Sequence, residues 1–165
     1  MKKRKLTRQD RILIIVAAVL LSIILFSVIF YVRATRPMRQ AEAETTAIAK
    51  KYADITTVDQ FYWFNREKTY FSVTGTTAKG QEAAVIVPKA GEKVTVLDLS
   101  EGFTEEEARA QITSSYAQEE VQTAKLGMYD DQPCWEVVTK TSTAELNYYL
   151  LDFKSGEEIK KVTNI

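Results

Sequence analysis

Residues 101–163 read EGFTEEEARAQITSSYAQEEVQTAKLGMYDDQPCWEVVTKTSTAELNYYLLDFKSGEEIKKVT, and this stretch decides the fold. Its first part has the pattern of a helix. Thr104 followed by Glu105–Glu107 forms a capping box and places acidic side chains at the positive end of the helix dipole. Ala108 and Ile112 lie four residues apart on one narrow apolar stripe. The sequence therefore predicts a short helix that packs through one face.

Four short runs of β-branched and aromatic residues follow this helix. They are separated by turn sequences such as Asp130-Asp131-Gln132-Pro133 and Lys154-Ser155-Gly156-Glu157. Short runs of this composition, bounded by turns, are typical of antiparallel strands. The predicted strands cover residues 120–130, 132–140, 145–154 and 157–163. The second half of the chain is therefore expected to be one helix on a sheet of about four strands.

The same order occurs in the preceding residues. A helical pattern covers residues 38–55, and strand patterns follow at 58–65, 68–76, 81–89 and 92–99. Sliding the chain against itself by 65 residues places Gly91 on Gly156 and Val94 on Ile159. This agreement predicts an internal repeat of about 60 residues. Units of that size are marginally stable alone, so we expect the two to pack together or share a sheet edge.

A run of 21 uncharged residues, ILIIVAAVLLSIILFSVIFYV, occupies positions 12–32. A helix of that length spans about 31 Å, which is the hydrocarbon thickness of a bilayer. A cleaved signal peptide is the alternative, but its apolar core is usually shorter and ends in small residues, whereas Arg33 stands here. We interpret the run as an uncleaved transmembrane helix. Pro37 is expected to break the helix beyond it.

The chain is formally neutral, with 22 basic and 22 acidic residues, but its charge is divided between two regions. Residues 1–39 have a net charge of +8 and residues 40–165 a net charge of −8. The basic residues predicted to flank the membrane are Lys2, Lys3, Arg4, Lys5, Arg8, Arg11, Arg33, Arg36 and Arg39. Six precede the span and three follow it, which favours a cytoplasmic N-terminus and an exported body. The acidic body makes nucleic acid a poor partner.

The predicted organisation is therefore a cytoplasmic tail (1–11), a transmembrane helix (12–32), a juxtamembrane linker (33–40) and two domains (41–99 and 100–165). The fold class is α+β, with the transmembrane helix followed by two tandem units, each of them one helix on a small antiparallel sheet. The protein is expected to be a single-pass protein of the cell membrane.

Composition argues against catalysis. The chain has no His and a single Cys, Cys134, so a Ser-His-Asp triad, a His-ligated metal site and a disulfide within the chain are excluded. Cys134 is interpreted as a small buried apolar residue. Adjacent acids at 105–107, 130–131 and 157–158 are interpreted as solvated cap and turn residues, because no spaced calcium-loop pattern occurs. We expect no metal, no cofactor, no catalytic residues and no small-molecule substrate.

Exposed aromatic side chains are the candidate partner surface. Four aromatics in a row occupy one predicted strand, and alternation places two on each face, so that one pair belongs to the core. The other pair is either packed or exposed to a protein or glycan partner. The candidate residues are Phe61, Tyr62, Trp63, Phe64, Tyr148 and Tyr149.

Two segments of the second half resemble the PepSY pattern, a Trp-Glu-Val strand followed by a strand that ends in Asp-x-x-(Thr/Ser)-Gly-(Lys/Glu)-x-(Ile/Val). Here they are Pro133–Val138 and Tyr148–Ile159. With Tyr70–Gly75 and Val85–Pro88 in the first half, the whole chain resembles the TseB-like family of Gram-positive bacteria. That resemblance implies two PepSY-like domains outside the membrane.

The resemblance also implies a non-enzymatic regulator of cell-wall elongation that contacts a penicillin-binding transpeptidase or another wall-synthesis protein. An inhibitor or chaperone of an extracellular peptidase is the alternative, since PepSY units have that role in some protease propeptides. A wall hydrolase that uses two carboxylates is a third hypothesis.

Overall fold

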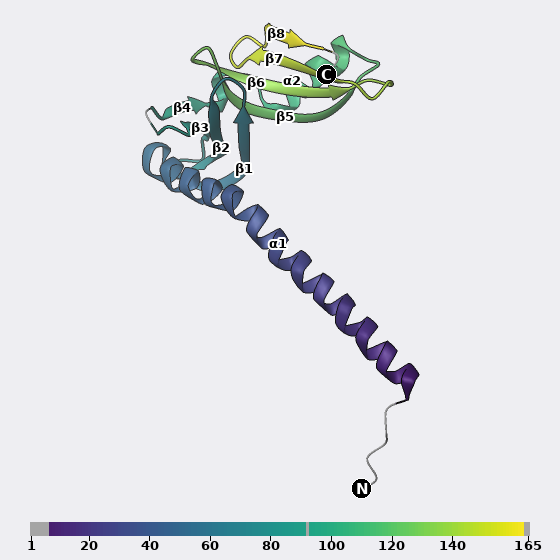
Figure 1. Ribbon diagram of the computed structural model, residues 1–165. Coiled ribbons are helices and arrows are strands. Elements are labelled where there is room, and N and C mark those ends of the chain that lie inside the picture. Colours follow the sequence, from purple (N-terminus) through teal and green to yellow (C-terminus); the bar gives the residue numbers. More distant parts are fainter. Residues whose placement is uncertain (1–6, 92, 164–165) are drawn as a thin grey trace. The chain divides into compact units, whose positions relative to one another are not determined.

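The computed structural model describes residues 7–91 and 93–163. Figure 1 shows a long N-terminal helix, two antiparallel sheets and a second, short helix. The helices are α1 (Arg8–Ala53) and α2 (Glu105–Ser115), with a 3-10 turn, η1 (Leu99–Glu101), between the two sheets. The strands are β1 (Ile55–Asn65), β2 (Thr69–Thr77), β3 (Glu82–Pro88), β4 (Thr95–Asp98), β5 (Glu120–Tyr129), β6 (Gln132–Lys140), β7 (Leu146–Asp152) and β8 (Glu158–Val162). The predicted α+β class, with one helix and four strands in each half, is confirmed.

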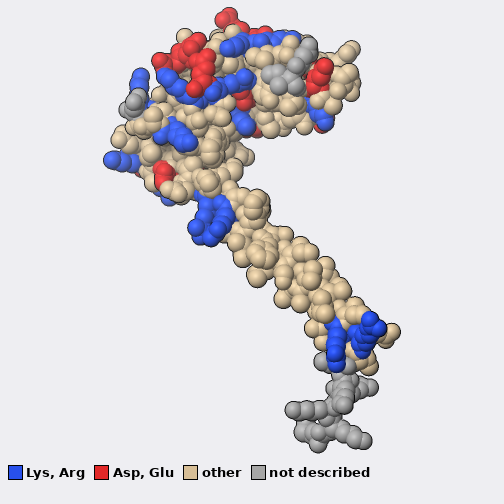
Figure 2. Space-filling model, in the orientation of Figure 1, with Lys and Arg blue, Asp and Glu red and all other residues tan. Residues whose placement is uncertain are grey.

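Helix α1 contains a segment apolar enough to cross a membrane, with a mean hydropathy of 3.3 in its most apolar window. Its apolar side chains are exposed, and in Figure 2 the segment is tan between basic side chains at both ends. The hydroxyl of Ser22 donates to the Ala18 carbonyl at 2.8 Å, so this polar group is satisfied inside its own helix. Such internal bonding is what a hydrocarbon environment requires.

The expectation that Pro37 breaks this helix is wrong, because α1 continues through it to Ala53. Proline removes one backbone hydrogen bond and costs helical free energy, but the other residues of the helix keep their own bonds. Residues 33–40, predicted to be a linker, are therefore helical. The chain divides into two compact units after Gln40, and residues 41–165 form the second, which we call the body.

In the first sheet of the body the strand order is β1-β2-β3-β4. The last turns of α1 cover one of its faces through Ala49, which is fully buried among Ile55, Val73 and Val85. Because successive side chains of a strand point to opposite faces of the sheet, the residues next to these in sequence point to the face that α1 does not cover. A single residue in left-handed conformation, Asp54, separates the helix from β1.

The second sheet has the order β5-β6-β7-β8, and α2 packs on it through Ala108 and Ile112. The predicted capping box is confirmed, since the Thr104 hydroxyl accepts from the Glu107 amide while the Glu107 carboxylate accepts from the Thr104 amide. Trp135, 1% exposed, donates its indole hydrogen to the Phe103 carbonyl at 2.7 Å. This bond ties the segment before α2 to the centre of the sheet.

The two sheets are separate, but they share one core. Tyr62 and Phe64 from β1 are buried in the same cluster as Leu126 and Trp135 from the second sheet. A methyl group on Gly127 would lie 2.1 Å from Cγ of Phe64, so only glycine permits this close approach. The expectation that the two halves pack against one another is confirmed.

The sequence offset of 65 residues is visible in the element bounds. Strand β1 begins at Ile55 and β5 at Glu120, which are separated by that offset, and both strands pair with the next strand across an irregular register near their beginnings. The two halves therefore repeat the same order of elements.

Candidate functional site

The two faces of β1 divide the aromatic row. Tyr62 and Phe64 belong to the core, with 8% and 0% of their surface exposed. Phe61 and Trp63 lie half-buried on the opposite face. Tyr62 and Phe64 are therefore the core pair, and neither offers an accessible surface to a partner in this conformation.

Phe61 and Trp63 form an aromatic trio with Phe71 of β2, a residue that the sequence reasoning did not select. The Phe61 and Phe71 rings stack with centroids 6.1 Å apart, and Trp63 contacts Phe71 edge-to-face at 5.1 Å. All three are half-buried. Trp63 of β1 lies directly opposite Phe71 of β2, and this strand pairing, which links residues of two different strands, is what brings the trio together.

The two tyrosines of β7 lie on opposite faces. Tyr149 is fully buried, and its hydroxyl donates to Glu119 at 2.8 Å. Burial, with the hydrogen bond to Glu119, raises the pKa of Tyr149. Tyr148 is half-buried, and the guanidinium of Arg66 lies 4.7 Å from its ring centroid. Of the predicted surface residues, Phe61, Trp63 and Tyr148 are therefore the accessible ones.

Arg66 also joins the two sheets by an ion pair. It lies in the turn between β1 and β2, and its Nε donates to Oε2 of Glu136 in β6. The Glu136 side chain is 7% exposed and that of Arg66 is 22% exposed. Nη2 of Arg66 is buried without a hydrogen-bond partner in the part of the chain that is described. This pair was invisible in the sequence because its members are 70 residues apart.

The carboxylates singled out in the sequence serve the helix cap, ion pairs and turns. Glu105 accepts from the Tyr62 hydroxyl at 2.7 Å and from Nε of Arg109 at 2.8 Å. Burial, with the contact to Glu105, raises the pKa of Tyr62. Asp130 and Asp131 form the two-residue turn between β5 and β6 in left-handed conformation. Within residues 7–91 and 93–163, no group of three or more acidic, His or Cys side chains is arranged to hold a metal ion.

Cys134 is fully buried in β6 beside Trp135, which confirms its interpretation as a core residue. Burial is the main cause that raises the pKa of its thiol to about 12. At neutral pH the residue is therefore a thiol and not the nucleophilic thiolate.

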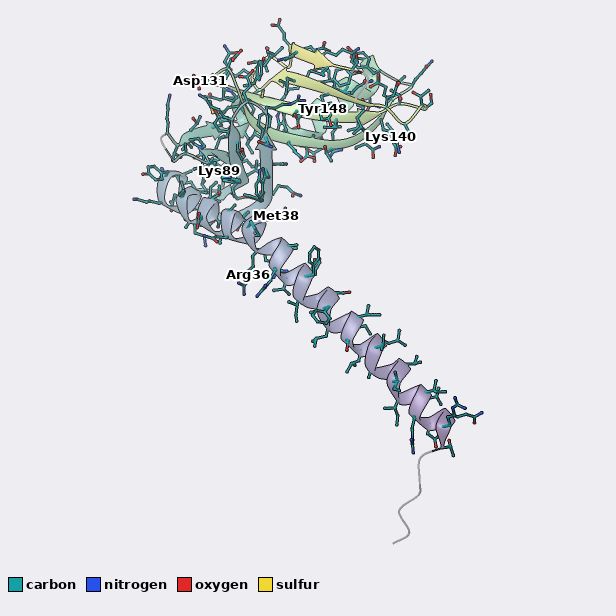
Figure 3. All side chains as sticks on the ribbon, in the orientation of Figure 1. Arg36, Met38, Lys89, Asp131, Lys140 and Tyr148 are labelled. Carbon is teal, nitrogen blue, oxygen red and sulfur yellow. The ribbon has the colours of Figure 1, made fainter. Side chains whose placement is uncertain are left out.

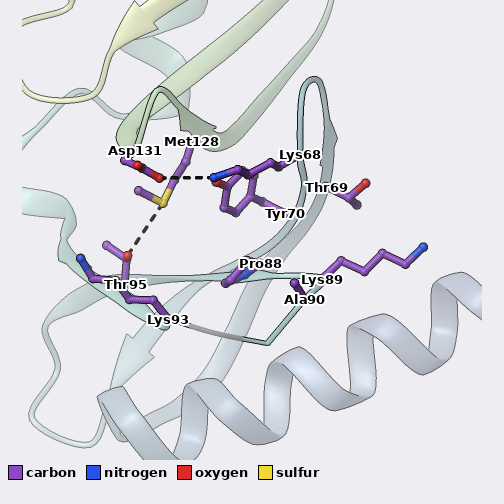
Figure 4. A pocket seen from close by; sticks show the side chains of 10 residues that line it. All are labelled: Lys68, Thr69, Tyr70, Pro88, Lys89, Ala90, Lys93, Thr95, Met128 and Asp131. Atoms are coloured by element: carbon purple, nitrogen blue, oxygen red, sulfur yellow. Dashed lines mark hydrogen bonds and ion pairs between the residues drawn. The ribbon is translucent and has the colours of Figure 1, made fainter.

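A groove of about 790 Å³ lies where the first sheet meets the β5–β6 turn, and sequence reasoning did not find it. Figure 4 shows its lining side chains, which are Lys68, Thr69, Tyr70, Pro88, Lys89, Ala90, Lys93, Thr95, Met128 and Asp131. Tyr70, 6% exposed, and Met128 supply apolar surface to its lining. The volume is within the range of small-molecule sites.

Some of the predicted membrane-flanking residues lie outside the described residues, and the others lie on α1. Lys2, Lys3, Arg4 and Lys5 lie outside the described residues. Arg8, Arg11, Arg33, Arg36 and Arg39 are exposed on α1. Their contact with lipid stays a prediction.

Comparisons with known proteins agree with the resemblance found in the sequence. The family model described as "Cell wall elongation regulator TseB-like domain" matches residues 44–88. The "Probable cell wall elongation regulator TseB" of Bacillus subtilis is 29% identical over an alignment of 155 positions, which covers 91% of this chain and 94% of that protein. The solved structure of the YpmB protein from Bacillus subtilis matches 73% of this chain and 95% of its own, with a TM-score of 0.65 and 27% identity. The TseB-like resemblance is thereby confirmed.

Proposed function

We propose that this TseB-like protein is a membrane-anchored regulator of cell-wall elongation that acts by binding another protein. The observation that carries the proposal is the extent of the similarity to the Bacillus subtilis protein, 91% of this chain and 94% of that one. The similarity therefore includes both the apolar helix and the body. The name of that relative supports a regulatory role and says nothing of a reaction.

The body supports a binding role better than a catalytic one. Its candidate acids are engaged in a cap, a turn or an ion pair, as with Glu107, Asp131 and Glu105. A carboxylate pair that hydrolyses glycosidic bonds must instead face a common cleft with separated roles. Cys134, the only thiol, is buried. We therefore propose that the protein is not an enzyme.

We further propose that α1 crosses the membrane once, with the N-terminus in the cytoplasm and the body outside. Support comes from the apolar segment of α1 and from the excess of basic residues before it. We retain residues 41–99 and 100–165 as two PepSY-like domains because both have one helix and four strands in the same order. Their shared core indicates that they act as one body.

The proposed partner is a penicillin-binding transpeptidase, as the family resemblance implies. The aromatic trio of Phe61, Trp63 and Phe71 is the proposed contact surface. Aromatic side chains are enriched at protein interfaces because they bury a large area at low entropic cost. A tethered body that presents this surface can position a partner close to the membrane without any chemistry of its own.

Isolation of the full-length protein from cross-linked membranes tests this proposal. A fluorescent penicillin then identifies transpeptidases among the recovered proteins. We expect one transpeptidase to be enriched over a control membrane protein in which residues 1–40 are fused to an unrelated exported domain. Recovery of an extracellular peptidase in its place would favour the inhibitor hypothesis and contradict the proposal.

A further inference from the structure

We propose that the groove beside Tyr70, lined by Lys68, Lys89 and Lys93, binds a linear polyanion with repeated phosphate groups, such as a glycerol phosphate polymer. This proposal goes beyond the regulatory role and does not depend on the identity of its protein partner. It rests on the charge, the shape and the side-chain chemistry of the groove.

The first argument is the local charge. Residues 40–165 have a net charge of −8, but the described residues that line the groove include three lysines and one acid, Asp131. Nζ of Lys68 lies 3.9 Å from Asp131, and both side chains are largely exposed. Lys89 and Lys93 are exposed and form no ion pair with the described residues. Two ammonium groups therefore remain available to an anion within an otherwise acidic body.

The second argument is the spacing of the charges. In Figure 4 Lys93 extends to one side of the groove and Lys89 to the other, while Lys68 reaches across the middle toward Asp131. These ammonium groups do not converge on one point, as a site for a single small anion requires. A chain that carries one charge in each repeating unit can contact them in succession.

The third argument is the type of donor. Among the described residues, the cations that line the groove are three lysines, whose ammonium groups bind phosphate oxygens as point charges. The hydroxyl of Thr95 makes only a weak contact of 3.8 Å to the Met128 sulfur, so it can turn to donate to a phosphate oxygen. The apolar surface formed by Tyr70 and Met128 suits the carbon atoms between phosphates.

Titration of the full-length protein, held in phosphatidylcholine nanodiscs, with soluble poly(glycerol phosphate) tests the proposal. The variant Lys89→Gln/Lys93→Gln is expected to bind about tenfold more weakly, because it loses two phosphate contacts and the associated counterion release. The matched control is Lys79→Gln/Lys140→Gln, which removes the same charge from exposed lysines outside the groove. In Figure 3 Lys140 lies at the opposite end of the body from Lys89. We expect the control to bind within about twofold of the unmodified protein.

A variant with the opposite expected effect excludes a folding artefact. Asp131→Asn removes the acid that competes for Lys68, and it should tighten binding about threefold. Added salt should weaken polymer binding by the unmodified protein more steeply than polymer binding by the Lys89→Gln/Lys93→Gln variant.

The proposal would be overturned if the groove variant and the control variant lost affinity for the polymer equally, or if the unmodified protein did not bind the polymer. Poly-glutamate that binds as tightly, with the same dependence on Lys89 and Lys93, would contradict the assignment to phosphate. Phosphatidylglycerol vesicles that bind while the soluble polymer does not would assign the groove to a lipid headgroup instead.

Discussion

Arg66 and Glu136 form an ion pair that connects the two sheets of the body, with the charged Nε–H donating directly to the carboxylate. The guanidinium also lies over the Tyr148 ring. Arg66 closes the hairpin of β1 and β2, while Glu136 lies in the centre of the second sheet. The arrangement of the two halves therefore depends on a polar contact as well as on the shared apolar core.

Removal of Arg66 alone should lower the free energy of unfolding more than replacement of both Arg66 and Glu136 by apolar residues. Arg66→Ala leaves the buried Glu136 carboxylate without a cation, and we expect a loss of about 2–3 kcal/mol in the free energy of unfolding. The double variant Arg66→Met/Glu136→Leu should recover most of that loss. Urea denaturation of the three proteins measures both effects. Lys68→Ala, which removes an exposed pair, is the control and should leave stability unchanged. A double variant less stable than Arg66→Ala would show that the pair has no such role.

Gly127 provides a second test of the contact between the sheets. Gly127→Ala forces a methyl group against the Phe64 ring, and we expect a loss of about 2–3 kcal/mol because a packed core accommodates added volume poorly. Gly80→Ala is the matched control. Nothing lies near Gly80, so only its left-handed backbone conformation opposes the change, and the cost should be about 1 kcal/mol. The double variant Gly127→Ala/Phe64→Leu should lose less free energy of unfolding than the sum of the two single variants, because the smaller side chain makes room for the methyl group. Strictly additive losses would show that the two residues are not in contact.

Local patterns were sufficient to predict most of this fold. The capping box at Thr104 and the strand runs depend on residues close in sequence, and each was found within a few positions of its predicted bounds. Pro37 was misjudged because a local breaker signal competes with the cooperative bonding of the helix on both sides. Two halves with one element order were also visible in the sequence, because the offset of 65 residues preserves glycine and apolar positions.

The candidate sites were harder to predict because they are made by strand pairing and sheet packing. Alternation divides the row at 61–64 into two pairs but does not say which face the second sheet covers. Lys68, Lys89 and Lys93 line one groove only because β2 pairs with β3 and the β5–β6 turn lies beside them.

Glu119 should make the body lose stability in acid. Burial acts to raise the pKa of this carboxyl, but hydrogen bonds from Thr139, Tyr149 and Asn147 outweigh it and the pKa is lowered. A group with a lowered folded-state pKa stabilises the protein above its unfolded value of 4.5, and that contribution disappears as the pH falls through the folded value. Glu119→Gln should therefore be less stable than the unmodified protein at pH 7, and the difference should shrink below about pH 4.

Urea denaturation between pH 3 and 7 measures this dependence. Glu120→Gln, a change of the same kind at the exposed neighbouring position, is the control and should leave the pH profile unaltered. If the difference between Glu119→Gln and the unmodified protein stayed constant with pH, the carboxylate would have no stabilising role.

The orientation in the membrane can be tested with thiol labelling, because the native thiol contributes little background. Cys134 is buried and its pKa is raised to about 12, so it should react with maleimide only after unfolding. A cysteine introduced by Lys140→Cys should be labelled in intact cells by a membrane-impermeant maleimide. One introduced by Arg8→Cys, before the apolar segment, should be labelled only after the membrane is opened. The reverse pattern would contradict an exported body.

Site-specific photo-cross-linking in living cells tests the regulatory account most directly. A photoreactive benzoylphenylalanine replaces Trp63 in the aromatic trio or, as the control, the exposed Lys140, which is not part of the trio. The account predicts that the Trp63 position yields an adduct that binds fluorescent penicillin, while the Lys140 position does not. An absence of penicillin-binding adducts at Trp63, or equal adducts at both positions, would contradict a transpeptidase contact through this surface.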